Sequence, residues 1–241
     1  MTVETIQTLD FLAPYTGSSD LTLLEVGCGE GALALSLSQK LVVTAIDKDE
    51  RAVLTAAQKG VEALLVNFLE YPEGAEKFDI VLFTRSLHHI QPLAGAVSKA
   101  AKLLKPSGLL ILEDFAVEKA DAATVEFFFR ARAELVASGL LSSHSFIHSF
   151  DPCADPMTWW RHHHLEKHHV ATGAEMLAAI SEHFSIEKED YVPYLYRYLV
   201  SDLLPGVDTT DVEWAIFGNE ERLCEEERIL PIGYRLVATK K

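Results

Sequence analysis

Three glycines, each separated from the next by one residue, follow an apolar run in the stretch LTLLEVGCGEGALALSL, residues 21–37. Glycine lets the backbone turn sharply and approach a ligand closely, because no Cβ stands in the way. Leucines then recur at helical spacing, so the unpaired N–H groups of a helix start face the same ligand. Gly27, Gly29 and Gly31 therefore predict a nucleotide-binding turn between a strand and a helix.

A carboxylate follows this turn at the distance expected for a ribose ligand. Asp47 ends the second predicted strand, in the sequence VTAID, and its two oxygens can accept hydrogen bonds from both ribose hydroxyls. The sequence GCGEGA also satisfies the relaxed dinucleotide fingerprint, in which Ala32 replaces the third glycine. Turn and carboxylate together indicate an adenosine cofactor, and at this point NAD remains an alternative.

The elements that position these residues alternate along the chain. Helical patterns over 30–39, 49–58 and 92–104 separate strand-like runs at 21–26, 41–46, 62–66, 78–83 and 108–113. A helix with a capping box over 172–183 and strands at 185–191 and 232–239 follow. The pattern predicts an α/β fold with a doubly wound, seven-stranded, mostly parallel sheet.

Composition favours one domain spanning residues 1–241. Of these 241 residues, 49% are hydrophobic and 24% are charged, which is sufficient for a full core. A net charge of −15 without a basic stripe disfavours nucleic acid as a partner. Neither a basic, apolar leader nor a membrane-length apolar run is present, so we expect a cytoplasmic protein. Cys28, Cys153 and Cys224 lack the spacing of a disulfide framework or a thiolate metal site.

The segment 115–170 interrupts the alternation and predicts a helical insertion that forms a lid over the ligand edge. It contains the run WWRHHHLEKHH, whose aromatic rings and imidazoles could surround an aromatic or cationic acceptor. The residues predicted to line the substrate are Trp159, Trp160, His163, His164 and Tyr194. Core packing is the alternative for these rings. His164 and His168 have the i, i+4 spacing of a helical metal pair, but no HExxH motif is present, and we predict no metal.

Over residues 20–115 the sequence resembles the class I S-adenosylmethionine (SAM)-dependent methyltransferases. The resemblance rests on four motifs, LLEVGCGEG, VTAID, KFDIVLFTRSLHHI and LKPSGLLILED. It implies that SAM binds at the glycine turn and at Asp47, and that Glu25 and the carbonyls around Thr84 and Arg85 receive its ammonium group. A dinucleotide fold has no need of the predicted hairpin of the last two strands, whereas the methyltransferase family ends in one.

The resemblance also implies an adenine site after the third strand, where the family usually has Asp and this chain has Asn67. The Asn67 carbonyl oxygen could face the adenine amino group, and the Phe68 N–H a ring nitrogen. The predicted cofactor-binding residues are Glu25, Gly27, Cys28, Gly29, Gly31, Asp47, Lys48, Asn67, Phe68, Thr84 and Arg85.

In-line methyl transfer needs alignment above all, and a base only when the nucleophile arrives protonated. The candidate catalytic residues are His88, His89, Asp114 and His168. We predict methyl transfer from SAM to an O, N or S nucleophile of a small organic acceptor, with S-adenosylhomocysteine (SAH) as the product. The alternatives are a protein methyltransferase, a SAM-binding interaction module without catalysis, and an NAD-binding oxidoreductase.

Overall fold

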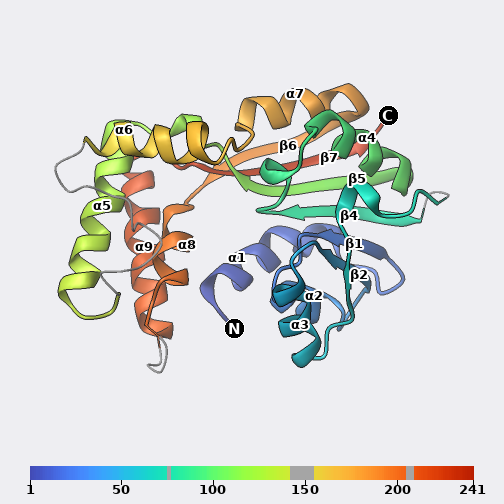
Figure 1. Cartoon of the computed structure of the whole chain (residues 1–241), viewed down its shortest axis with the longest axis horizontal. Helices are drawn as coiled ribbons and strands as arrows, with labels where there is room; N and C mark the ends of the chain where they lie inside the picture. Colours follow the sequence, from blue (N-terminus) through green and yellow to red (C-terminus); the bar gives the residue numbers. More distant parts are fainter. Residues whose placement is uncertain (75–76, 142–154, 205–208) are drawn as a thin grey trace. The chain divides into compact units, whose positions relative to one another are not determined.

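The computed structural model describes residues 1–74, 77–141, 155–204 and 209–241 (Figure 1). It contains a seven-stranded sheet in the order β3-β2-β1-β4-β5-β7-β6. The strands are β1 (Thr22–Val26), β2 (Val42–Asp47), β3 (Ala63–Leu65), β4 (Phe78–Thr84), β5 (Leu104–Phe115), β6 (Phe184–Val192) and β7 (Gly233–Lys240). The first five strands pair in parallel and β7 is antiparallel, so the predicted fold class is confirmed.

The central strands are buried because they carry uninterrupted apolar runs. Leu23 and Leu24 of β1 and Val81 and Leu82 of β4 are fully buried. A parallel strand covered by helices on both faces requires apolar residues on both of its sides. The same runs made these strands predictable within a few residues.

One boundary differs from the prediction. The sequence KPSG was expected to form a loop between a helix and a strand, but β5 already begins at Leu104, opposite Phe78 of β4. The next pair along β4 is Ile80 with Leu109, so the residues between bulge out of the ladder, and Ser107 has φ 60° there. The turn residues are therefore a bulge inside the strand.

The helices of the sheet unit include α2 (Ala32–Leu37), α3 (Glu50–Gln58), α4 (Leu93–Leu103) and α7 (Gly173–His183). Side-chain caps favour the starts of α3 and α7. Asp49 caps α3 by accepting from the N–H groups of Arg51 and Ala52. Thr172 and Glu175 form the predicted capping box of α7. The helix α1 (Val3–Leu12) was not predicted; its residues Phe11 and Leu12 pack into the core.

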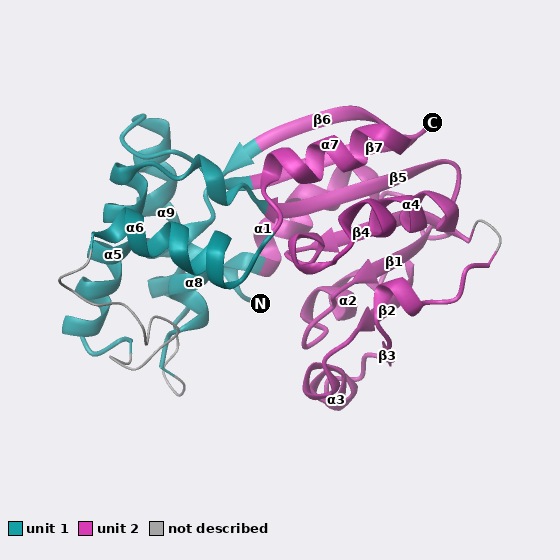
Figure 2. Cartoon of the chain, turned by 45° about the horizontal axis from the view of Figure 1, so that its top comes forward, with its two compact units in different colours: residues 1–4, 115–170, 191–233 teal, residues 5–114, 171–190, 234–241 magenta. Residues whose placement is uncertain are grey.

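The chain forms two compact units (Figure 2). The sheet unit comprises residues 5–114, 171–190 and 234–241, and the helical unit comprises residues 1–4, 115–170 and 191–233. The predicted insertion 115–170 thus belongs to a larger helical unit, and its role as a lid stays a prediction. The described helices of this unit include α5 (Ala122–Ala137), α6 (Pro156–Arg161), the π-helix His162–Lys167, α8 (Leu195–Ser201) and α9 (Thr210–Glu225).

Two further predictions can be placed. Within the described ranges, every helix is too short or too polar to cross a bilayer. Cys28 and Cys224 are free thiols, and Cys153 lies outside the described residues. The cytoplasmic location stays a prediction.

Candidate functional site

A cavity of about 340 Å³ opens in the sheet unit at the carboxyl ends of β1 to β4. Ligands of open α/β sheets bind at this edge. The cavity is lined by Val26, Gly27, Ile46, Asp47, Lys48, Val66, Asn67, Phe68, Leu69, Arg85, Ser86, His89, Ile90 and Gln91. Six of the predicted cofactor-binding residues are therefore brought to one place.

The three glycines of the turn are needed for different reasons. Gly27 has φ +78°, and a Cβ there would come within 2.6 Å of the Ser86 Cβ. Gly31 also has φ +78°, and its Cβ would come within 2.9 Å of the Ala56 Cβ. Gly29 has φ +53° with no atom within 4 Å of its Cβ position. Two glycines therefore permit close packing, whereas Gly29 leaves open space for a ligand.

Asp47 is oriented by the backbone on either side of it. Its Oδ2 accepts from the Gly29 N–H at 2.8 Å, and its Oδ1 accepts from the Asp49 N–H at 2.9 Å. Each carboxylate oxygen has a further lone pair for a ligand hydroxyl. The carboxylate is thus held in place at the cavity wall and can still accept two hydrogen bonds from a ribose.

Glu25 is a buried carboxyl group with an unsatisfied oxygen. It precedes the cavity residues Val26 and Gly27, and only 1% of its surface is exposed. Among the described residues, its Oε2 has no hydrogen-bond partner. Burial raises the pKa of Glu25 to about 8, against the opposing influence of the Arg85 charge and a hydrogen bond from Thr84. Such a group is stabilised when a cation binds beside it.

The side of the cavity after β3 is formed by a short 3₁₀ turn, Phe68–Glu70. The Asn67 Oδ1 accepts from the Leu69 N–H at 3.0 Å, so the amide that was predicted to face adenine also caps this turn. Phe68 packs edge-to-face against Phe83. Lys99 of α4, which sequence reasoning missed, is buried and donates to the Leu69 carbonyl at 2.6 Å. The position of Lys99 among the alanines of α4 that are buried was the signal in the sequence that could have indicated a buried lysine.

Three other predicted cofactor residues are placed around this cavity. Cys28 is buried and its N–H donates to the Ile46 carbonyl, so it supports the turn rather than lining the cavity. Burial raises the pKa of its thiol to about 12. The Thr84 side chain forms a hydrogen bond with the Glu25 carboxyl group. Lys48 lines the cavity next to Asp47.

Three of the candidate catalytic residues lie together in the sheet unit. His88 and Asp114 are buried, with His88 Nδ1 2.6 Å from Asp114 Oδ1. The His88 ring contacts the ring of His89, at 4.0 Å between centroids, and His89 lines the cavity. Neighbouring Glu113 binds Arg235 and the Thr8 hydroxyl through its two oxygens, so its role is structural.

The remaining candidates belong to the helical unit and contact one another. Trp159 stacks on His163 at 4.5 Å, and Trp160 lies 4.3 Å from His164. Tyr194 stacks on Phe115, and all of these side chains are buried. Within the described residues these rings therefore form an aromatic core, the alternative that sequence reasoning had kept open.

The π-helix changes the expected histidine pairing. The His168 N–H donates to the His163 carbonyl, an i to i+5 bond, and the rings of these two residues lie 4.6 Å apart. The ring beside His168 is thus that of His163, five positions away, rather than the i, i+4 partner His164. Burial lowers the pKa of His163 to about 4, which makes it a weak base at neutral pH.

A family model described as a methyltransferase domain matches residues 2–179. The chain belongs to the methyltransferase domain family. A curated relative, the ubiquinone biosynthesis O-methyltransferase of Caulobacter vibrioides, is 35% identical over 108 residues. That match spans 42% of this chain and 42% of the relative, so less than half of either protein is compared.

Solved structures show the same fold at low identity. The N-methyltransferase NodS from Bradyrhizobium japonicum, in complex with SAH, has a TM-score of 0.54 and 14% identity, covering 98% of this chain and 86% of NodS. The [4+2]-cyclase SpnF has a TM-score of 0.57 and 19% identity, covering 97% of this chain and 80% of SpnF. The family model, which matches residues 2–179, confirms the family resemblance predicted for residues 20–115. At such identities the structural likeness concerns the fold alone.

Three features of this methyltransferase domain fit SAM. Glu25 has a buried oxygen that accepts no hydrogen bond from any described residue. Gly29 has open space at its Cβ position, and Asp47 presents two acceptor oxygens at the cavity wall. The adjacent pair β6 and β7 separates this sheet from a plain dinucleotide fold, so the NAD alternative is set aside.

Proposed function

We propose that this chain transfers the methyl group of SAM to an oxygen, nitrogen or sulfur atom of a small organic acceptor. The observation that supports the proposal is that Asp47 and Gly27 of the glycine turn line one cavity, and that the buried Glu25 carboxyl group precedes the lining residues Val26 and Gly27. SAM, when bound, supplies an electrophilic methyl group on a sulfonium. Asp47 would hold the ribose, and Glu25 would pair with the ammonium.

The chain's own residues would then provide alignment and, where the acceptor carries a proton, a base. His89 is our candidate for this base because it lines the cavity. His88 would be a positioning residue, since Asp114 orients its ring against that of His89. Asn67 and Phe68 would contact the adenine.

The net charge of −15 supports a small or cationic acceptor over a nucleic acid. The Caulobacter relative is an O-methyltransferase by name, which favours testing phenols first. A protein acceptor and a SAM-binding module without catalysis are the outcomes to be distinguished.

Two glycines allow a controlled test of cofactor binding. Gly29 and Gly60 both have positive φ and no atom within 4 Å of the Cβ position, but only Gly29 belongs to the turn at the cavity. Both substitutions by leucine therefore incur a similar backbone strain. In calorimetric titrations with SAM, SAH and NADH, we expect SAM and SAH to bind the native protein and the G60L variant, and not G29L. Binding of NADH alone would refute the proposal.

Transfer itself is measured with SAM labelled in the methyl group. Label recovered in phenols, amines or thiols supports a small-molecule enzyme. Label recovered in protein supports the protein methyltransferase, and tight SAM binding without any transfer supports the interaction module.

A further inference from the structure

Arg85 occupies an unusual position at the cavity. It directly follows β4, lines the cavity and has φ +53°, a conformation uncommon for residues other than glycine. Its N–H donates to the Glu113 carbonyl of β5 at 2.7 Å, which holds the backbone in this conformation. Its side chain is exposed, so its guanidinium group can meet a ligand.

The strand order predicts which part of the cofactor reaches Arg85. Along the sheet the order is β3, β2, β1 and β4, with Asn67 after β3, Asp47 ending β2 and Arg85 after β4. A cofactor whose ribose lies on Asp47, with its adenine toward Asn67, extends its amino-acid end toward β4. This step rests on the proposed function.

The charges at this end match those of an amino acid. The amino-acid end of SAM carries an ammonium and a carboxylate. Arg85 supplies a positive charge for the carboxylate, and Glu25 supplies a negative charge once a neighbouring ammonium lowers its raised pKa and the carboxyl group ionises. The two groups already interact, because the Arg85 charge acts on the Glu25 carboxyl. Lys48, the other Lys or Arg among the described lining residues, follows Asp47 on the ribose side. Guanidinium groups bind carboxylates through paired N–H groups.

We propose that Arg85 binds the carboxylate of the cofactor's amino-acid end and makes the site selective for SAM and SAH over adenosine ligands that lack this carboxylate. The adenosine part of the ligand is held independently, by Asp47 and the turn after β3.

Three ligands separate this role from others. SAH carries both charged groups, its analogue without the α-amino group carries only the carboxylate, and methylthioadenosine carries neither. Calorimetry at constant pH compares the native protein with R85M, R85K and R85G. The control is R130M, which removes the same charge from an exposed position on α5.

We expect R85M and R85G to weaken SAH and the carboxylate-only analogue by roughly tenfold each, as for a charge-assisted hydrogen bond. Methylthioadenosine should change less than twofold, R85K should retain part of the affinity, and R130M should bind like the native protein. R85G guards against misfolding, because glycine adopts the positive φ of this position without strain.

Two results would overturn the inference, and a third would refute the proposed function on which it rests. An equal loss for methylthioadenosine would show that Arg85 acts only on the structure of the cavity. A loss for SAH without a loss for the carboxylate-only analogue would show that it acts through Glu25. Failure of the native protein to bind any of the three ligands would instead refute the proposed function, and that result is seen before any variant is made.

Discussion

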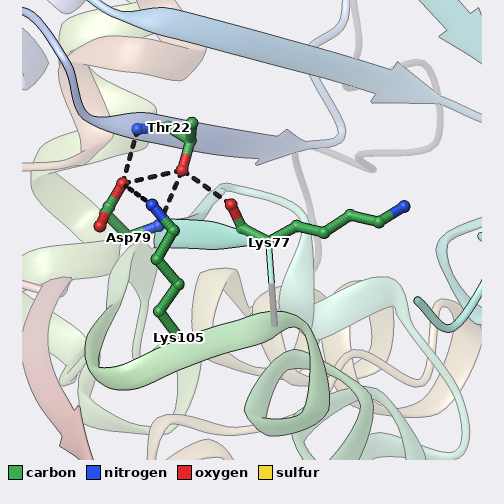
Figure 3. A network of polar contacts seen from close by, with 4 residues as sticks. All are labelled: Thr22, Lys77, Asp79 and Lys105. Carbon is green, nitrogen blue, oxygen red and sulfur yellow. Dashed lines mark hydrogen bonds and ion pairs between the residues drawn. The ribbon is translucent and has the colours of Figure 1, made fainter. Parts of the chain in front are cut away.

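The two edges of the sheet, formed by the amino ends and by the carboxyl ends of the central strands, differ in how completely their polar side chains are hydrogen-bonded. At the amino ends of β1, β4 and β5, Asp79 accepts from the Thr22 N–H and from Lys105 Nζ, each at 2.8 Å (Figure 3). The Thr22 hydroxyl accepts from the Asp79 N–H and can donate to the Lys77 carbonyl. At the carboxyl ends, by contrast, Glu25 Oε2 has no hydrogen-bond partner in the described ranges of the chain, and a cavity lies next to this strand end.

The pKa values of the two carboxyl groups reflect this difference. Burial raises the pKa of both, but at Asp79 the hydrogen bonds from Lys105 and Thr22 outweigh it and the pKa is lowered. At Glu25 burial dominates and the pKa is raised to about 8. Ionised Asp79 therefore stabilises the fold at the amino ends of the strands. At the carboxyl ends, ionisation of the buried Glu25 destabilises the fold unless a cationic ligand binds beside it.

The largest effect that we expect is a pH-dependent cost of Glu25. Without cofactor, the folded protein holds a proton on Glu25 up to a pKa of about 8, whereas the unfolded chain releases it at its ordinary value of 4.5. The contribution of Glu25 to the free energy of unfolding is thus complete below pH 4.5 and decreases as the pH rises toward 8. The decrease is about 1.4 kcal/mol per pH unit.

The variant E25Q, which cannot ionise, should lack this decrease and be more stable than the native protein at pH 8, while binding SAM poorly. Denaturant unfolding between pH 7 and pH 8 isolates the effect, because the raised pKa of Glu220, about 7, acts mainly below that range. Parallel pH profiles of E25Q and the native protein would contradict the assignment.

The next effect is on cofactor binding. Replacing Asp47 with Ala removes both ribose acceptors and should weaken SAM binding about 100-fold, since a hydrogen bond to a charged group contributes about 1.5 to 3 kcal/mol. D47N keeps one acceptor oxygen and should fall between D47A and the native protein. Calorimetry measures both, and an affinity within twofold of the native value for D47A would show that the ribose lies elsewhere.

These predictions also show what the sequence can and cannot indicate. The strands, the glycine turn and Asp47 were predictable because apolar runs, glycine spacing and the end of a strand are local signals. The partners at the amino-terminal edge were not, because Thr22 and Asp79 are separated by 57 positions. Arg235 reaches Glu113 across 122 positions, and only the folded sheet shows that this carboxylate is already occupied. Likewise, the histidine pairing was predicted for an α-helix, and the π-helix altered it.

A third effect should appear at the opposite edge and leave binding unchanged. D79A removes the acceptor of Thr22 and Lys105, and should lower the free energy of unfolding by about 1 to 2 kcal/mol. The control E73A breaks the exposed ion pair with Lys102 and should cost less than about 0.5 kcal/mol. Denaturant unfolding with parallel SAM titrations tests both variants. A threefold change in SAM affinity for D79A would show that the amino-end edge also contributes to cofactor binding.

The smallest effect tests how the cavity side after β3 is held. The backbone of Leu69 makes two hydrogen bonds to side chains. Its N–H donates to the Asn67 Oδ1, and its carbonyl accepts from Lys99 Nζ. K99M removes the second bond from a site that Phe68 and the Asn67 cap continue to hold. We therefore expect a loss of about threefold to fivefold in affinity, the order of one hydrogen bond.

Because Lys99 supports the adenosine side, the loss should be equal for SAH and methylthioadenosine, unlike the selective loss expected for Arg85. K102M is the matched control, since Lys102 lies on the same helix and pairs only at the surface with Glu73 among its described contacts. Calorimetry with the two ligands decides the question. A loss confined to SAH would mean that the turn after β3 contacts the amino-acid end, and the order of cofactor parts along the strands would have to be reversed.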